Sequence, residues 1–506
     1  MTRPNRGRRT SVDTVVTDRA WRDLKYPYMP IEPLSPDEIE LIHQSAMSVL
    51  ENVGMRIQDG QARSILKDAG FRVDEAAEHV FFDAGLVMEL VAGAPAVATV
   101  RGLDAGKRVK MGQGHFALTA VGGPPFVSDL KNGRRYGTFE DQKNFLKLTA
   151  QSDLLQIMGG TCVEASDLPP ASRYLDYYLA CCTLSDKPWK PLTIGRHRAR
   201  DAIEMAKLWY GETEEQLAAD PVFFLNTNTN TPLVLDGEIA QGVIEYARLG
   251  QPITVTPFAL AGAMAPATVA GALVMQTAET LACCALVQAI RPGAPYIYGA
   301  FICNADMRSG SPAFGTPEST FGAQASGQMA RFYGLPWRSS NVNASNAVDA
   351  QAAYESMMSL WGSMTGQASI FNHGAGWLEG GLVGSYEKFI IDLEMLGLMI
   401  AWQTPPAITK EEIGLESIAE VGPGGHFFGT SHTMERYKAA FYSPLVSDWS
   451  NFEKWQENGS LDATQRASNI CETMLNEFEA PKLDPAAHEA LQEYVAKRKR
   501  EIEAMA

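Results

Sequence analysis

The stretch VFFLNTNTNTPLVLDGEIAQGVIEYARLGQPITVTPF, residues 222–258, contains one complete unit of the fold. An apolar run around Phe224 leads into a polar loop, then into a helical segment, and then into a β-branched run around Val255. Asp236 can cap the start of the helix, and Gly250 can end it. This order predicts two parallel strands that are joined by a helix.

The same alternation continues in both directions along the chain. Eight apolar runs alternate with helical stretches, and they centre near Ala120, Ile157, Thr193, Phe224, Val255, Ile297, Trp337 and Ile370. The 250 residues from the first centre to the last match the usual size of a (β/α)8 barrel, about 250 residues. We therefore predict an α/β fold with a TIM barrel over residues 115–404. A doubly wound open sheet is the alternative, although no GxGxxG motif opens a helix after a first strand.

Extensions are predicted on both sides of the barrel. Residues 35–114 begin with an amphipathic helix that has Ser35 as its cap and Pro36 at its first position. Residues 405–506 are expected to be mostly helical. Residues 1–34, which include the basic segment RPNRGRR, are predicted to form a flexible arm.

Composition excludes several classes of protein. The chain has 43 Lys and Arg against 59 Asp and Glu, and its net charge of −16 disfavours nonspecific binding to nucleic acid. The seven cysteines, among them the adjacent pairs Cys181/Cys182 and Cys283/Cys284, resemble buried small hydrophobes rather than a disulfide framework. No secretory signal follows the N-terminal arginines, and Pro266 interrupts the longest mildly apolar stretch. We expect a cytoplasmic protein with no membrane or nucleic-acid partner.

The segments that follow the predicted strands are rich in amides, hydroxyls and aromatic rings. Active sites of TIM barrels lie at these strand ends. The tract NTNTNT, residues 226–231, is compatible with turns closed by Asn and Thr side chains. Together with Phe258, Phe301 and Trp377, it also fits a pocket that holds a cation by ring faces and a carboxylate by neutral donors. No lysine occurs in these segments, which argues against a Schiff-base aldolase.

The loop FNHGAGWLEGG, residues 371–381, follows the last predicted strand. Its glycines suit either a close approach to a ligand or a tight turn. His373 is a candidate ligand-binding group or a structural hydrogen-bonding residue, and Glu379 either contacts a ligand or anchors the loop. A divalent metal is conceivable at His197, Glu164, Asp306, His373 or Glu379. No local spacing demands such a metal, and none is predicted.

Four long stretches carry a family resemblance. They are PPFVSDLKNGRRYGTFED (124–141), YGLPWRSSNVNASNAVDAQAAYES (333–356), FNHGAGWLEGGLVGSYEKFIIDLEMLG (371–397) and VGPGGHFFGTSHTMERYKAAFYSP (421–444). In this order they resemble the trimethylamine methyltransferase superfamily, which comprises the corrinoid-dependent methylamine and betaine methyltransferases. The similarity extends from about residue 35 to about residue 480.

The resemblance implies a (β/α)8 enzyme that presents an N-methyl group to a Co(I) corrinoid (cobalamin), carried by a cognate partner protein or free. The founding trimethylamine enzymes carry pyrrolysine, which here would fall in or near residues 338–346, and no such residue is present. This departure favours glycine betaine or a close relative such as proline betaine or carnitine. Because a quaternary ammonium already has a neutral amine as its leaving group, orientation and electrostatics are sufficient for catalysis. S-adenosylmethionine is not expected, since no Gly-rich nucleotide loop follows a strand.

The resemblance and the strand ends together assign roles to ten residues. His373 and Asn343 are the candidate catalytic residues. The candidate substrate-binding residues are Trp377, Phe301, Phe258, Asn226, Asn228 and Glu379. Gly374 and Gly376 are the candidate cofactor-binding residues, because they would let the corrin approach.

Two other functions stay open at this point. A metal-dependent TIM-barrel lyase or hydrolase would use the scattered carboxylates and histidines. A nonenzymatic binder of quaternary amines would normally be an exported two-lobed protein. The expected partners of the leading hypothesis are a small quaternary amine and a corrinoid protein, and a homo-oligomer is compatible with the sequence.

Overall fold

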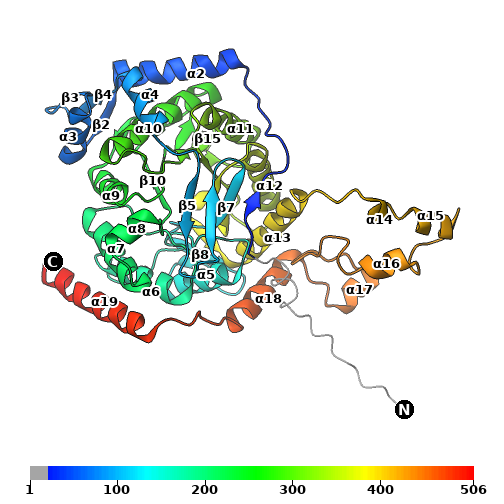
Figure 1. Cartoon of the computed structure of the whole chain (residues 1–506). Coiled ribbons are helices and arrows are strands. Elements are labelled where there is room, and N and C mark those ends of the chain that lie inside the picture. The colour runs from blue at the N-terminus through cyan, green and yellow to red at the C-terminus, as the bar shows by residue number, and fades with distance from the viewer. Residues whose placement is uncertain (1–20, 506) are drawn as a thin grey trace.

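The structure, a computed structural model, describes residues 21–505. Figure 1 shows a central group of strands surrounded by helices, with extensions at both ends of the chain. The predicted flexible arm lies outside the described residues as far as residue 20. In the described part of that segment, Leu24–Lys25 form strand β1, which pairs antiparallel with β7 (His115–Ala120).

Parallel strands confirm the predicted α/β class. Six predicted strand centres fall in or directly beside a strand: β7, β10 (Leu225–Asn228), β12 (Ile253–Thr256), β14 (Tyr298–Gly299), β17 (Trp337–Ser340) and β18 (Ile370–Ala375). One parallel ladder contains β7, β18, β17 and β14 in this order. A second ladder joins β10 to β12 in parallel.

The other two predicted strands do not belong to a ladder. Ile157 forms a single bridge to Thr119. The next extended segment lies at Trp189, which is bridged to Phe223, so the prediction of a strand at Thr193 is wrong by four residues. The assigned ladders therefore do not close into one continuous barrel.

Proline explains why the segment at Trp189 is so short. Pro188 and Pro191 flank it, and neither has the N–H group that a ladder requires. Single backbone hydrogen bonds cross the gaps instead: Met158 N donates to Pro188 O at 2.9 Å, and Phe224 N donates to Trp189 O at 3.3 Å.

Eight helices lie outside the strands in the order expected for repeated βα units. They are α5 (Phe139–Gln151), α6 (Arg173–Leu184), α7 (Arg196–Tyr210), α9 (Gly237–Arg248), α10 (Val269–Ile290), α11 (Pro317–Phe332), α12 (Ala350–Thr365) and α13 (Tyr386–Trp402). The predicted cap at Asp236 is confirmed, because its side chain accepts from Glu238 N and Ile239 N. Thr138 forms a capping box with Asp141 at the start of α5. Helix α10 is long and apolar enough to cross a membrane, but 72% of its apolar window is buried inside the fold.

A β-hairpin covers the N-terminal ends of the strands. Strands β5 (Ala98–Arg101) and β6 (Arg108–Met111) pair antiparallel. Their buried side chains share one cluster with residues from the starts of the central strands: Ala98, Val100, Val109, Met111, Ala117, Ile157, Phe224, Ile297 and Ile370. This apolar plug leaves the carboxyl ends of the strands as the place for a site.

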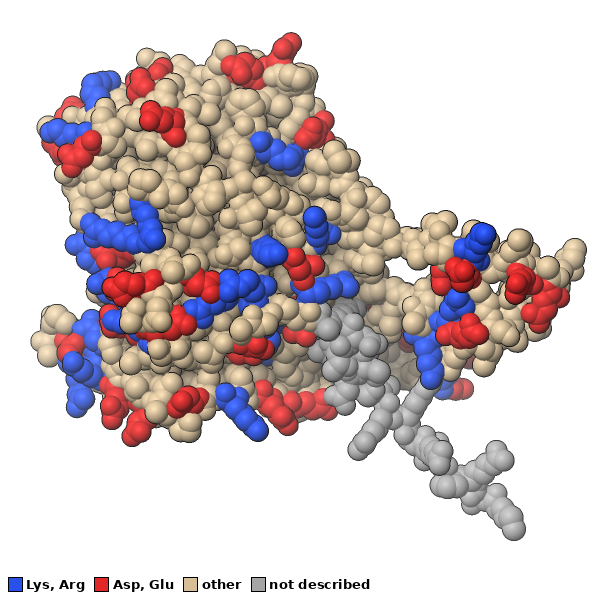
Figure 2. Space-filling view, in the orientation of Figure 1, with Lys and Arg blue, Asp and Glu red and all other residues tan. Residues whose placement is uncertain are grey.

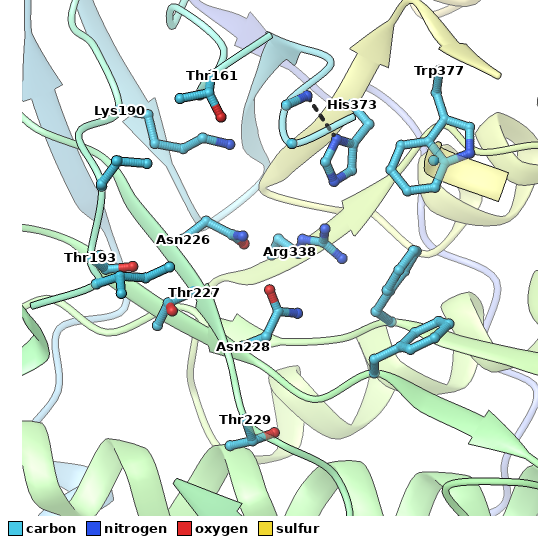
Figure 3. A pocket seen from close by; sticks show the side chains of 18 of the residues that line it. Thr161, Lys190, Thr193, Asn226, Thr227, Asn228, Thr229, Arg338, His373 and Trp377 are labelled. Atoms are coloured by element: carbon cyan, nitrogen blue, oxygen red, sulfur yellow. Dashed lines mark hydrogen bonds between the residues drawn. The ribbon is translucent and has the colours of Figure 1, made fainter. Parts of the chain in front are cut away.

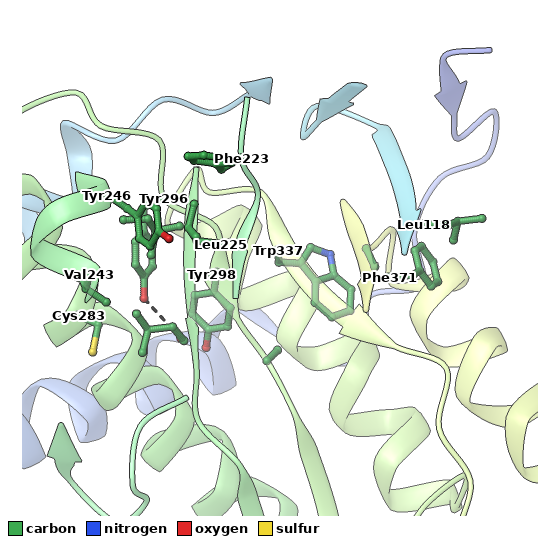
Figure 4. Packing of buried hydrophobic residues seen from close by; sticks show 14 of the residues in the cluster. Leu118, Phe223, Leu225, Val243, Tyr246, Cys283, Tyr296, Tyr298, Trp337 and Phe371 are labelled. Carbon is green, nitrogen blue, oxygen red and sulfur yellow. Dashed lines mark hydrogen bonds between the residues drawn. The ribbon is translucent and has the colours of Figure 1, made fainter. Parts of the chain in front are cut away.

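The main core lies between the strands and the surrounding helices. Figure 4 shows Phe223 and Leu225 in this layer together with Tyr246 of α9. Phe224, between them in sequence, belongs to the plug instead. Alternate side chains of a strand point to opposite faces, so these three residues give the strand an inner and an outer face.

The N-terminal extension packs on α10. Its helices are α2 (Pro36–Ser48), α3 (Gly60–Asp68) and α4 (Ala84–Ala92), with the π-helical turn η1 (Val49–Val53). Its sheet has the order β11 (Val234–Leu235), β2 (Met55–Ile57), β4 (His79–Phe81), β3 (Arg72–Asp74). Strand β11 therefore ties this extension to the loop that follows β10.

Two small sheets lie beyond the carboxyl ends of the strands. One has the order β19 (Trp377–Leu378), β20 (Val383–Ser385), β8 (Phe126–Asp129), β9 (Gly133–Tyr136), with the turn η2 (Glu379–Gly381). The other contains β13 (Ala259–Ala261), β15 (Ile302–Ala305) and β16 (Pro312–Ala313). Trp377 of the first sheet lines the cavity described below, as do Phe258, Phe301 and Phe314, which lie directly beside strands of the second sheet.

The chain after α13 first leaves the body and then returns. Short helices α14 (Lys410–Ile413), α15 (Leu415–Val421), α16 (Ser431–Arg436) and α17 (Phe452–Glu457) form a projection (Figure 1). Helix α18 (Ala463–Asn476) packs on α13 and α5, and α19 (Pro485–Met505) runs along α6 and α7. The short helix α8 (Glu214–Ala219) follows α7.

Candidate active site

A cavity of about 760 Å³ lies at the carboxyl ends of the central strands (Figure 3). Six predicted site residues line it: His373, Trp377, Phe301, Phe258, Asn226 and Asn228. They come from the ends of different strands, as active-site residues of this architecture do. Their roles stay predictions, but the structure brings them together.

Aromatic rings form one wall of the cavity. Phe258 and Phe301 lie 5.2 Å apart, and Phe314 lies 5.7 Å from Phe301 and 5.9 Å from Trp377, measured between ring centroids. Trp377 meets Phe301 and Phe314 edge-on, with interplanar angles of 86° and 85°. A methylated ammonium binds well against such ring faces. Sequence reasoning missed Phe314, which follows the short strand β16.

Two buried cations face the same cavity, and sequence reasoning missed both. Lys190 and Arg338 are 6% and 1% exposed. Arg338 Nη1 donates to Ala300 O at 3.0 Å, whereas its buried Nε has no partner. Within residues 21–505, neither cation forms an ion pair with a carboxylate. Burial lowers the pKa of Lys190 to about 8 and that of Arg338 to about 9, so a bound anion would stabilise both charges.

His373 lies between the cations and the aromatic wall. Its Nδ1 accepts a hydrogen bond from Gly122 N at 3.3 Å, and its ring centroid is 4.4 Å from that of Trp377. Burial, and then the charges of Arg338 and Lys190, hold the pKa of His373 well below its usual value. The ring is therefore neutral, and with Nδ1 as acceptor, Nε2 carries the proton and can donate.

A network of buried polar groups supports the loop that carries His373 and Trp377. Asp392 forms an ion pair with Lys388, and both side chains are fully buried. Asp392 Oδ2 accepts from Gly376 N at 2.8 Å, and Asp392 Oδ1 accepts from Asn341 Nδ2 at 2.8 Å. His373 itself has φ of 57°, an unusual value outside glycine. The network fixes the strained loop from behind.

Asn343 lies in this supporting layer and does not line the cavity, which corrects the expectation that it faces the substrate. Its Nδ2 donates to Trp377 O at 2.7 Å and to Ser356 Oγ at 3.3 Å. The Trp377 indole Nε1 donates back to Asn343 O at 3.0 Å. Asn343 is therefore placed as a positioning residue for the indole.

Glu379 and the two predicted cofactor-binding glycines also lie outside the cavity lining. Glu379 accepts two hydrogen bonds from Arg134, at 2.7 and 2.9 Å, so it anchors the loop to β9. A Cβ at Gly374 would lie 2.7 Å from Thr119 O, and Gly376 has φ of 99°. Packing and backbone conformation thus account for these glycines, and their role toward a corrin stays a prediction.

The amide tract is partly structural. Asn228 Nδ2 donates to Thr256 O at 2.8 Å, and Asn226 Oδ1 accepts from Thr256 Oγ1 at 3.3 Å. Buried Glu279 of α10 accepts from Thr231 Oγ1 at 2.8 Å and also holds Thr229. The two asparagines still reach the cavity, so both interpretations of the tract apply.

The candidate metal ligands do not converge. Among the described residues, no group of three or more His, Cys, Asp or Glu is placed to hold a metal ion. Glu164 pairs with Arg173 at 2.7 Å, and Asp306 accepts from Ser309 Oγ at 2.7 Å. His197 packs against Tyr174. No contact in the described chain therefore favours the metal-dependent alternative.

Comparison with known proteins identifies the family. The trimethylamine methyltransferase (MTTB) family matches residues 2–503. The chain is 34% identical over 470 residues to glycine betaine methyltransferase of Desulfitobacterium hafniense, and the aligned region covers 93% of this chain and 97% of that protein. It is 27% identical over 475 residues to proline betaine:corrinoid methyltransferase of Eubacterium limosum, and the aligned region covers 91% of this chain and 96% of that protein. Superposition on the solved structure of the monomethylamine methyltransferase of Methanosarcina barkeri gives a TM-score of 0.47 at 10% sequence identity, and it covers 88% of this chain and 93% of that chain.

The residues matched span almost the whole chain, including both extensions. The match also includes every strand end that lines the cavity. This chain therefore belongs to the trimethylamine methyltransferase (MTTB) family.

Proposed function

We propose that this protein transfers a methyl group from a carboxylate-bearing quaternary amine to the Co(I) of a corrinoid on a partner protein. The substrate is glycine betaine or a close relative such as proline betaine or carnitine. One observation carries the proposal: an aromatic wall and two buried cations share one cavity, and in the described chain those cations have no carboxylate partner. Similarity to the glycine betaine and proline betaine enzymes supports the same class of substrate.

The rings and the cations suit the two ends of a betaine. The trimethylammonium group would contact the ring faces, and the carboxylate would accept from Lys190, Arg338 and the Nε2–H of His373. Arg338 Cζ lies 4.8 Å from the centroid of Phe301, so the two subsites adjoin. This spacing favours a short link between ammonium and carboxylate. The bound carboxylate would also separate two cations that otherwise repel each other.

The size and the lining of the cavity support access by a corrinoid. Its 760 Å³ is in the range of sites for much larger ligands than a single betaine. Gly123 and Gly160 line it, and a Cβ at Gly123 would meet nothing within 4 Å, so this wall presents little bulk. When bound, the corrinoid would supply the nucleophile that accepts the methyl group, and the amine nitrogen would keep the electron pair of the broken C–N bond and become neutral, while the carboxylate of the product stays charged. The chain itself would orient the methyl group and exclude water.

We also propose that the fold is a closed (β/α)8 barrel. The order of strands and helices and the plug at the N-terminal ends support this arrangement. The two hydrogen bonds at Pro188 and Trp189 would span the gaps where prolines prevent a longer ladder, and the single bridges Thr119–Ile157 and Ile253–Tyr296 would complete the ring.

A panel of N-methylated amines tests the function. The enzyme is incubated with Co(I) cobalamin and each amine, without S-adenosylmethionine, and methyl-Co(III) is followed by absorbance. Glycine betaine or a short relative should react faster than choline or trimethylamine, which have no carboxylate. Equal rates for choline and the betaines would exclude the proposed carboxylate site. Turnover that requires S-adenosylmethionine would exclude corrinoid chemistry.

The pH dependence should depend on the charge of the substrate. Below pH 8 the Lys190 ammonium is protonated and attracts a carboxylate, and above its pKa of about 8 this attraction is lost. The kcat/KM for glycine betaine should therefore fall above about pH 8, while kcat/KM for choline should not. Measuring kcat/KM for both substrates between pH 6 and 9 checks whether it falls for glycine betaine alone. A decline shared by both substrates would contradict the assignment to Lys190.

Trp377→Leu should weaken binding of the trimethylammonium group. Leucine keeps apolar volume but lacks the ring face, and the expected loss is about 0.5–2 kcal/mol. Equilibrium dialysis with glycine betaine gives the affinity directly. Trp449→Leu is the matched control, because Trp449 is exposed and outside the cavity. If both variants bind like the parent protein, the aromatic wall has no part in recognition.

A further inference from the structure

The segment 405–445, here called the arm, is folded but has no core. It leaves the body after α13 and contains α14, α15 and α16 (Figure 1). His432 Nε2 lies 3.0 Å from Glu411 O, and Arg436 pairs with Glu412 at 3.2 Å. All of its residues are described, and none of its hydrophobic side chains is buried. An element of this kind gains little stability from its own packing.

The arm exposes a large apolar surface. Nine of its large side chains are between 45% and 87% exposed: Ile408, Ile413, Leu415, Ile418, Phe427, Phe428, Met434, Tyr437 and Phe441. At roughly 150 Å² for each such side chain, they present on the order of 900 Å². The largest apolar patch of a typical monomer is only about 300–600 Å². Figure 2 shows acidic and basic groups side by side on the arm, so no field of one sign marks it for a polyanion.

A second apolar surface lies beside the root of the arm. Its members, here called the aromatic face, are partly exposed residues of α12, α13 and the segment after β1: Tyr28, Tyr354, Met358, Trp361, Leu398 and Trp402. The ring of Trp402 lies 5.4 Å from that of Trp361 and 5.5 Å from that of Tyr28. Tyr354, Met358 and Trp361 follow the helical spacing of one stripe.

We propose that a second copy of this chain covers both surfaces, with the arm of each copy on the aromatic face of the other about a two-fold axis. Each copy carries one arm and one aromatic face, so a two-fold axis creates two identical contacts, each between the arm of one copy and the aromatic face of the other. The six side chains of the aromatic face expose on the order of 400 Å², so two arm–face contacts that each bury this area on both partners would remove on the order of 1,600 Å², in the range of stable interfaces, about 1,200–2,000 Å². Glu394 fixes the root of each arm by accepting from Val446 N at 2.9 Å and Ser447 Oγ at 3.1 Å.

The position of the face argues for a second copy rather than a corrinoid carrier. Helix α13 starts at Tyr386, directly after the strand that pairs with Trp377. It then runs for 17 residues, about 25 Å, to Trp402. The part of the aromatic face around Trp402 is therefore at the far end of this helix from the cavity, whereas Tyr354 lies near the start of α12, next to Glu355, which accepts from Ala344 N and Ser345 N in the loop after β17. A protein that delivers a corrinoid to the cavity would not cover Trp402.

Sedimentation velocity on the full chain tests the interface. At about 10 μM the parent protein should sediment with twice its chain mass of 55.1 kDa. Phe428→Asp with Phe441→Asp on the arm, and Trp402→Asp on the face, should each raise the dimer dissociation constant at least about 100-fold. Leu41→Asp is the matched control, because Leu41 is exposed on α2 and belongs to neither surface. It should stay dimeric.

Two results would overturn the interface. One is a parent protein that sediments as a monomer. This result includes a parent protein that stays monomeric alone and forms a complex only with an added corrinoid protein. The other is an arm or face variant that assembles like the parent. Circular dichroism of each variant confirms that its fold is intact. Methyl transfer is measured separately, so a failure of the proposed function does not affect this test.

Discussion

Replacing Arg338 by methionine should weaken the binding of glycine betaine by about 30-fold or more. The guanidinium is buried, has a free Nε and pairs with no carboxylate within the described chain. Removing one partner of a buried, hydrogen-bonded charge pair typically costs about 2–5 kcal/mol, and about 1.4 kcal/mol corresponds to a factor of ten. The loss should appear in KM and in kcat/KM for the betaine.

Choline separates recognition of the carboxylate from support of the pocket. It has the same trimethylammonium group but no carboxylate, so its inhibition constant should stay within about threefold or improve once a buried cation is gone. Arg308→Met is the matched control, because Arg308 is exposed and lies outside the cavity lining. If betaine and choline lose affinity equally, Arg338 acts by supporting Phe301, which it contacts at 4.8 Å.

Asp392→Ala should lower the free energy of unfolding by about 3–5 kcal/mol. The substitution leaves the fully buried ammonium of Lys388 without its carboxylate, and an uncompensated buried charge is strongly destabilising. The N–H of Gly376 and the amide of Asn341 also lose their acceptor. Guanidinium unfolding monitored by fluorescence measures the change. Lys454→Ala removes an exposed ion pair to Glu457 and should change stability by less than about 1 kcal/mol.

A double variant separates stability from positioning. Asp392→Leu combined with Lys388→Met replaces the ion pair by apolar groups, and such replacements are often neutral or stabilising. Stability should largely return, but Gly376 N still has no acceptor, so the loop that carries His373 and Trp377 loses its support. We expect kcat for methyl transfer to stay low. If both stability and kcat return, the network is purely structural.

Local sequence patterns predicted the fold class because their causes are local. Alternating apolar runs and capped helices defined the βα units, and Asp236 caps α9 as expected. The pattern did not locate the third strand, since Pro188 and Pro191 limit hydrogen bonding around Trp189. The family resemblance was confirmed by the match over residues 2–503.

The aromatic part of the site was also predictable from strand ends. Phe258, Phe301 and Trp377 follow predicted strands, and all three line the cavity. One residue in this region gave an unused signal: Arg338 is a charged side chain inside a short strand that is otherwise buried. An unpaired charge in such a place indicates a ligand more often than a solvated surface.

Only the tertiary structure decided which polar groups face the cavity. Lys190 and Arg338 come from segments almost 150 residues apart, and only the packing of neighbouring strands brings both into one cavity. The same packing places Asn343 behind the loop 371–381 and pairs Glu379 of that loop with Arg134, so neither residue lines the cavity. Periodicity in a sequence reports which face of its own element a residue occupies. The distance between two strand ends depends on how the sheet twists and packs, which no single segment encodes.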